Sequence, residues 1–99
     1  MEYTMEQKKF YIYQLADFLV AHDKTMSIGE LADHLNRNGF RAEIGNKFVA
    51  GKGLGNLVGA AYDFIKDAVA EEEARKVADA YVDRNGEPAH VVADRKRAA

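Results

Sequence analysis

The stretch Ser27-Ile28-Gly29-Glu30-Leu31-Ala32-Asp33-His34-Leu35-Asn36-Arg37-Asn38-Gly39 contains both a helix start and a helix stop. Ser27 and Glu30 have the spacing of a capping box, in which the serine oxygen accepts from the third helical amide and the glutamate accepts from the serine amide. Asn38-Gly39 supplies the left-handed residue that ends many helices. Between these signals runs one apolar stripe, formed by Ile28, Leu31 and Leu35. The stretch therefore predicts an amphipathic helix of about three turns.

Three more helices are predicted by the same three- and four-residue spacing of apolar residues. The first runs from Thr4, its N-cap, to about Ala21, and its predicted inward stripe comprises Met5, Tyr11, Ile12, Leu15, Phe18 and Leu19. Another runs from Leu54 to about Val69. The last opens with Glu71-Glu72-Glu73, because three carboxylates suit the positive end of the helix dipole.

Two segments have the signals of β-hairpins. Residues 40–49 alternate around Gly45-Asn46, which predicts a small hairpin or an ordered loop. Residues 81–92 flank Asn85-Gly86, the strongest two-residue signal for a type I′ turn, and Pro88 makes the second strand an edge strand. The predicted fold is therefore mainly α with small β-hairpins, a winged-helix or helix-turn-helix-like single domain over residues 1–93. Residues 94–99 form a basic tail that is expected to be disordered.

Length and composition narrow the class of protein. A chain of 99 residues fits one domain, and without cysteine neither a disulfide nor a cysteine-based zinc site can hold it together. No apolar run is long enough to span a bilayer, and the first residues lack the pattern of a signal peptide. We therefore expect a cytoplasmic protein that does not enter a membrane.

The sequence offers no recognisable catalytic centre. Ser27 is the only serine and is used as a cap, while the histidines fall in three different elements, so neither a triad nor a histidine metal site is expected. The cluster Gly51-Lys52-Gly53-Leu54-Gly55 lacks the spacing of a nucleotide-hydrolase loop. It is either an amide-rich, lysine-bearing helix start suited to a backbone phosphate or a plain glycine-rich connector. We expect a non-catalytic protein with no cofactor and no metal.

Residues 27–65 resemble the helix–loop–helix segment in the DNA-binding recombinase region of large serine recombinases. The resemblance rests on Leu35-Asn36, followed by Gly39, Gly45 and Phe48 at the intervals of that family. It implies that the helix after the loop lies against DNA. The recombinase catalytic domain is absent, so strand cleavage is not implied. A free-standing module of this kind would be typical of a protein from a phage, a plasmid or a genomic island.

The charge distribution is compatible with DNA binding on one face, although the net charge is -2. Residues 40–58 carry three cations and one acid, whereas residues 67–83 carry six acids and two cations. Arg41, Lys47 and Lys52 are the predicted phosphate contacts, and Asn46 and Asn56 are candidates for a base edge or a phosphate. The flanking DNA backbone would be contacted by Arg84, Arg95, Lys96 and Arg97. The first hypothesis is therefore a small winged-helix-like DNA-binding protein, which as a homodimer would double its contacts.

The alternative is a protein–protein interaction or self-association module. Tyr3, Phe10 and Tyr13 cannot all lie on the inward stripe of the first helix, so some aromatic surface is expected to be exposed. Phe10 and Tyr13, together with the acidic helix that begins at Glu71, would then form the interaction face.

Overall fold

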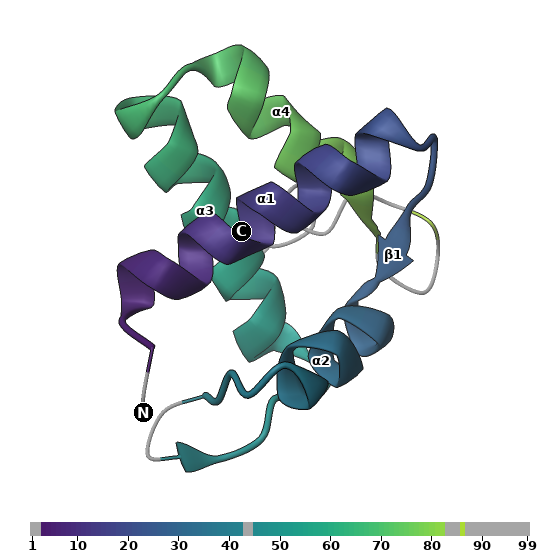
Figure 1. Cartoon of the computed structure of the whole chain (residues 1–99), viewed down its shortest axis with the longest axis vertical. Coiled ribbons are helices and arrows are strands. Elements are labelled where there is room, and N and C mark those ends of the chain that lie inside the picture. The colour runs from purple at the N-terminus through teal and green to yellow at the C-terminus, as the bar shows by residue number, and fades with distance from the viewer. Residues whose placement is uncertain (1–2, 43–44, 83–85, 87–99) are drawn as a thin grey trace.

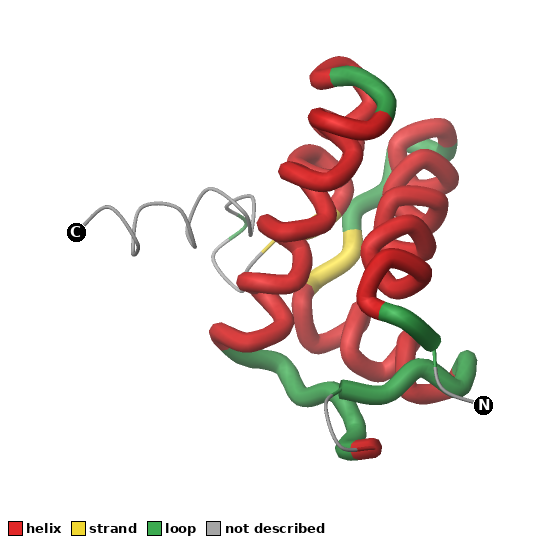
Figure 2. The backbone as a smooth tube through the Cα atoms, turned by 90° about the vertical axis from the view of Figure 1, so that its left-hand side faces the viewer, coloured by secondary structure: helices red, strands yellow, loops and turns green. Residues whose placement is uncertain are grey.

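The computed structural model describes residues 3–42, 45–82 and 86. Its helices are α1 (Met5–Ala21), α2 (Ile28–Arg37), α3 (Lys52–Ala68) and α4 (Glu71–Ala80), and its strands are β1 (Met26–Ser27) and β2 (Tyr81–Val82). These residues form one mainly helical domain, with the short strand pair lying among the helices (Figure 2). None of the helices in the described ranges is long and apolar enough to cross a bilayer.

The core lies where α1 crosses the α3–α4 pair, while α2 packs near the N-terminal end of α3 (Figure 1). The fully buried aliphatic side chains come from all four helices: Ile12, Leu31, Leu35, Val58, Ile65 and Val77. Small residues, Ala16 of α1 and Ala61 of α3 among them, are also fully buried and allow the helices to approach closely.

The predicted starts of α1 and α2 and the predicted end of α2 are confirmed, whereas α3 begins at Lys52, two residues before the predicted Leu54. The side-chain oxygen of Thr4 accepts from the backbone amide of Gln7 at 3.1 Å, and that of Ser27 accepts from the amide of Glu30 at 3.2 Å. In both cases the partner side chain accepts from the cap amide, so each helix begins with a complete capping box. After α2, Gly39 has a φ of 84°, the left-handed conformation that glycine adopts most readily.

The inward stripe predicted for α1 is wrong at two positions. Ile12 and Leu19 are buried as expected, but Met5 is 46% exposed and Phe18 is 54% exposed. The helix carries apolar residues on more than one face, so their spacing alone does not identify the face that packs. Ala16, which the predicted stripe omitted, occupies the centre of the buried face.

The loop between α2 and α3 takes the second of the two predicted forms. Residues 40–42 and 45–51 contain no strand, and the segment is closed by a hydrogen bond from the backbone amide of Ala42 to the carbonyl oxygen of Asn46 at 2.7 Å. Gly45 has a φ of 75° at this turn. The described part of this loop is therefore an ordered loop and not a β-hairpin.

The strand that was predicted to open the second hairpin pairs with a distant segment. Tyr81–Val82 runs parallel to Met26–Ser27, with Met26 opposite Tyr81 and Ser27 opposite Val82. Asn85 and the second predicted strand of that hairpin lie outside the described residues. The two-residue strands thus connect the segment before α2 to the segment after α4.

Candidate interaction surfaces

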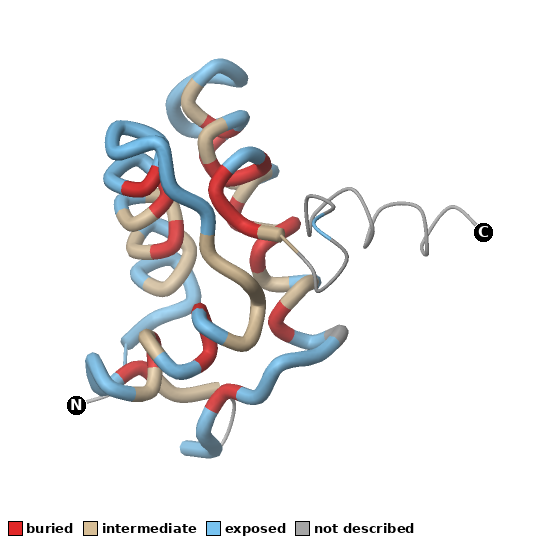
Figure 3. The backbone as a smooth tube through the Cα atoms, turned by 90° about the vertical axis from the view of Figure 1, so that its right-hand side faces the viewer, coloured by how far each residue is buried: buried red, intermediate tan, exposed pale blue. Residues whose placement is uncertain are grey.

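The predicted DNA contacts that the structure describes lie along the loop before α3 and the first turns of that helix. Asn46 and Lys47 are exposed on the loop, whose residues 45–51 face solvent apart from Phe48 (Figure 3). Lys52 begins α3, and Asn56 is exposed one turn later. Arg84, Arg95, Lys96 and Arg97 lie outside the described residues.

Arg41 is engaged within the fold. Its Nη1 donates to the carbonyl oxygens of Asn36 at 2.9 Å and of Phe40 at 2.7 Å, and the side chain is half-buried. The guanidinium thus donates to one carbonyl group in the last turn of α2, where a cation also complements the helix dipole, and to one in the loop that follows. Contact with a phosphate would have to compete with these two hydrogen bonds.

Asn36 has a role that the sequence pattern did not reveal. Its Nδ2 donates to the carbonyl oxygen of Phe48 at 2.8 Å, and its Oδ1 accepts from the amide of Phe48 at 2.7 Å. The side chain therefore pairs with the backbone of Phe48 as a neighbouring strand would. The recombinase resemblance thus rests on residues that shape or anchor this loop: Leu35-Asn36, Gly39, Gly45 and Phe48.

The N-terminus of α3 is open. Its N-cap is Gly51, which has no side chain, and no other described side chain caps it. The first helical hydrogen bond, from the amide of Gly55 to the carbonyl oxygen of Gly51, is 3.0 Å long. The backbone amides before Gly55 therefore have no partner within the helix. The positive end of the helix dipole lies at this N-terminus.

A groove with a volume of about 440 Å³ runs beside the N-terminal half of α1. The groove is lined by Tyr3, Glu6, Gln7, Phe10, Tyr11, Gln14, Phe40 and Phe64. Phe40 is buried, with the Tyr3 ring centroid 4.1 Å and the Tyr11 ring centroid 4.5 Å from its own. At the rim, Phe10 is 43% exposed and Tyr3 is 40% exposed. The exposed aromatic surface expected on the first helix is thus present, with one wall from α3.

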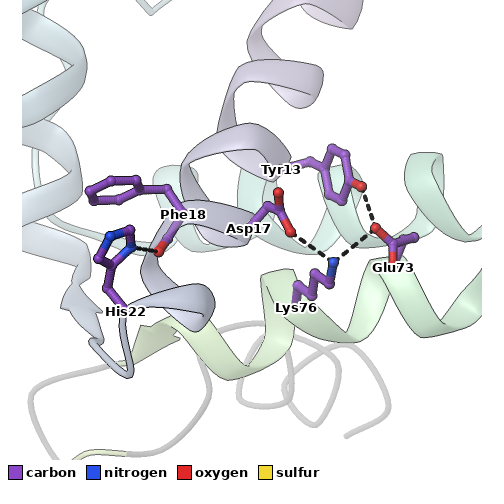
Figure 4. Close-up of polar contacts among 6 residues, drawn as sticks. All are labelled: Tyr13, Asp17, Phe18, His22, Glu73 and Lys76. Atoms are coloured by element: carbon purple, nitrogen blue, oxygen red, sulfur yellow. Dashed lines mark hydrogen bonds and ion pairs between the residues drawn. The ribbon is translucent and has the colours of Figure 1, made fainter.

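The two residues of the predicted interaction face, Phe10 and Tyr13, have different roles. Phe10 lines the groove, whereas the hydroxyl of Tyr13 donates to Oε1 of Glu73 at 2.6 Å. Lys76 Nζ lies 3.0 Å from the same carboxylate oxygen and 2.7 Å from Oδ1 of Asp17, so these side chains join α1 to α4 (Figure 4). The hydrogen bond from Tyr13, followed by that from Lys76, holds the pKa of Glu73 below its usual value. Tyr13 therefore makes a contact between α1 and α4 within the fold.

A second polar contact joins α1 to α2 beside the groove. The hydroxyl oxygen of Tyr11 lies 2.8 Å from Nε2 of His34, and both side chains are half-buried. Burial lowers the pKa of His34, and the charge of Arg37 lowers it further. The histidine is thus held toward its neutral form, in which its ring pairs with the tyrosine hydroxyl.

Among the described residues, no group of three or more histidine, aspartate or glutamate side chains is placed to hold a metal ion. Ser27 serves as the cap of α2, as its spacing predicted.

No protein-family model, no curated protein and no solved structure matches the chain.

Proposed function

We propose that the chain is a non-catalytic protein-interaction module that binds a partner polypeptide in the aromatic groove on α1. The observation that carries this proposal is the groove itself, in which a stacked aromatic floor supports the exposed rings of Tyr3 and Phe10. Its volume falls in the range of about 300–1,000 Å³ typical of binding pockets. Phe18 is a further exposed apolar residue of α1, about two turns beyond Phe10, which favours a polypeptide over a small molecule.

A peptide selection tests this proposal. The immobilised chain is screened against a displayed random peptide library, and the affinities of the selected peptides are then measured in solution by fluorescence anisotropy. We expect Phe10→Ser to weaken binding by about fivefold or more, because an exposed aromatic side chain that the partner covers contributes more than about 1 kcal/mol.

Val69→Ser is the matched control, since Val69 is also an exposed apolar residue but lies at the end of α3. Its affinity should equal that of the wild type. If the selection yields no peptides, or only peptides that bind the Phe10→Ser variant as tightly as the wild type, the proposed function is wrong.

DNA binding of the winged-helix type is the second candidate, supported by the resemblance of residues 27–65 to the recombinase segment. The observation that favours it is the uncapped N-terminus of α3, with exposed Lys47 and Asn46 on the loop before it. Free backbone amides at a helix start bind phosphate, and neighbouring lysines add a salt-sensitive attraction.

A salt titration of DNA binding tests this candidate. The double variant Lys47→Glu, Lys52→Glu should bind duplex DNA more weakly than the wild type and with a shallower dependence on salt. Lys66→Glu is the control, because this exposed lysine lies in the last turn of α3. Absence of binding at low salt, or equal losses in the double variant and the control, excludes the assignment.

A further inference from the structure

The lining of the groove on α1 is unusual in its chemistry. Of the lining residues that the structure describes, five are aromatic, two are glutamine and one is glutamate, and none is aliphatic. A groove built to hold leucine or valine would be lined largely by aliphatic side chains. Aromatic rings instead carry negative charge on their faces, and a cation placed over such a face is attracted to it.

Glu6 is the one charged residue among the described residues of this lining. It lies in the first turn of α1, is exposed, and forms no ion pair with any cation of the described residues. By contrast, Asp17 and Glu73, the acids that join α1 to α4, are both paired with Lys76. An unpaired carboxylate beside ring faces makes the groove complementary to a positive charge.

One ring of the groove already attracts a cation of this chain. Nζ of Lys9 lies 5.6 Å from the centroid of the Phe64 ring, within the range of a cation–π interaction. This contact occupies the α3 wall and leaves Phe10 and Tyr3 at the exposed rim. The same lysine repels a second cation, so its removal should favour an incoming one.

We propose that the groove accepts a lysine or arginine side chain of the partner polypeptide, with the cation near Glu6 and its aliphatic stem against the aromatic rim. This inference rests on the proposed function and specifies the chemistry of the partner. The exposed side chain of Gln14 adds a donor and an acceptor for the backbone beside the cation.

The test uses two capped tripeptides that differ only in charge, acetyl-Gly-Lys-Gly-amide and its norleucine counterpart. Each is titrated in the millimolar range into the ¹⁵N-labelled full chain, and the amide signals of Phe10, Gln14 and Phe64 are followed by NMR. We expect the lysine peptide to bind about threefold or more tightly than the norleucine peptide, since an exposed cation–π contact and an exposed ion pair each contribute up to about 1 kcal/mol.

Two surface variants give opposite expectations. Glu6→Gln should weaken binding of the lysine peptide and leave that of the norleucine peptide unchanged. Lys9→Gln should strengthen binding of the lysine peptide, because it removes a like charge and frees the Phe64 ring. Both substitutions keep the length of the side chain closely enough to preserve the fold, which the dispersion of the same spectra verifies.

Equal binding of the two tripeptides, no shift with the lysine peptide, or a Glu6→Gln variant that behaves as the wild type refutes the inference. Shifts of the same amides on dilution of the chain without peptide also refute it, because they assign the groove to a second copy. The proposed function is tested separately. If the binding of the selected peptides depends on Phe10 but not on Glu6, the groove still binds peptides and only the preference for a cation is refuted.

Discussion

At the scale of single residues, Asn36 anchors the loop that carries the predicted DNA contacts. Its amide makes two hydrogen bonds with the backbone of Phe48. We expect Asn36→Ala to lower the free energy of unfolding by about 1–3 kcal/mol, because the partly buried backbone groups of Phe48 lose their partner. Urea unfolding followed by circular dichroism measures this difference.

Asn38→Ala is the matched control for Asn36→Ala. Asn38 lies two residues further along and makes one exposed hydrogen bond, from its Nδ2 to the carbonyl oxygen of His34 at 2.7 Å. Its loss should cost less than that of Asn36. Equal destabilisation by both variants would contradict the anchoring role.

His34 makes stability depend on pH at mildly acid values. Burial lowers its pKa in the folded chain, so the unfolded chain binds the proton more readily. The contribution of neutral His34 to stability is fully present above the ordinary histidine pKa of about 6.5. It is lost as the pH falls through the lower pKa that His34 has in the folded chain. We expect the melting temperature to fall between pH 7.5 and pH 5, and to fall less in His34→Gln. Parallel pH profiles for the two chains would exclude this role.

At the scale of elements, the contact between α1 and α4 depends on Lys76, which lies between the carboxylates of Asp17 and Glu73. Both hydrogen bonds, with Asp17 first, raise the pKa of Lys76, so the side chain stays charged. Lys76→Met leaves two acids facing each other across the helices. We expect its melting temperature to fall at low salt and to recover in part at high salt, where the repulsion is screened.

Arg75→Met provides the comparison for Lys76→Met. Arg75 is exposed, and its one ion pair among the described residues is with Glu71 of its own helix, at 3.9 Å. A single exposed pair within one helix contributes little, so this variant should melt near the wild type. A fall as large as that of Lys76→Met would show that any lost cation on α4 has the same effect.

Capping residues and the spacing of apolar residues were sufficient to predict the four helices. The contacts between elements that are distant in the sequence could not be predicted in this way. The capping box of Ser27 and Glu30 and the acids that open α4 act within one turn, so their residue types determine where these helices begin. The packed face of α1 depends on which of several apolar faces meets α3 and α4, and Met5 and Phe18 were misplaced for that reason. The pairing of Tyr81 with Met26 has no local signal.

The aromatic groove on α1 could likewise be predicted only in part from the sequence. An exposed aromatic surface on the first helix followed from the number of aromatic residues there, and Phe10 lines the groove. Phe40 and Phe64 reach the same groove from the loop and from α3, and no spacing in the sequence relates them to Phe10. Tyr13 turned inward because Glu73 of α4 accepts its hydroxyl, a contact between residues 60 positions apart.

At the scale of the whole molecule, Tyr81 connects the two ends of the described chain. Its side chain is fully buried, and its hydroxyl donates to the carbonyl oxygen of Ile12 in α1 at 2.6 Å. We expect Tyr81→Phe to lower the free energy of unfolding by about 1 kcal/mol at neutral pH. Tyr3→Phe is the control in the same denaturation experiment, because it keeps the ring that stacks on Phe40 and should be close to neutral.

The same tyrosine makes the fold sensitive to alkali. Burial raises its pKa, so the unfolded chain loses the phenolic proton at a lower pH than the folded chain. The contribution of Tyr81 is therefore fully present below about pH 10 and is lost as the pH rises above it. Tyr81→Phe should show a smaller loss of stability between pH 9 and pH 11 than the wild type; an equal loss would assign the alkaline transition to other groups.

The parallel pairing of β1 with β2 has a consequence for the order in which the protein acquires its structure. Met26 and Ile12 each depend on a partner at position 81, which leaves the ribosome only after all four helices have been made. The N-terminal third therefore completes its contacts last, although it is synthesised first. A nascent chain that stops at residue 80 contains all four helices of the described residues but lacks the segment that holds α1 and β1 together, so folding should be completed after most of the chain has been translated.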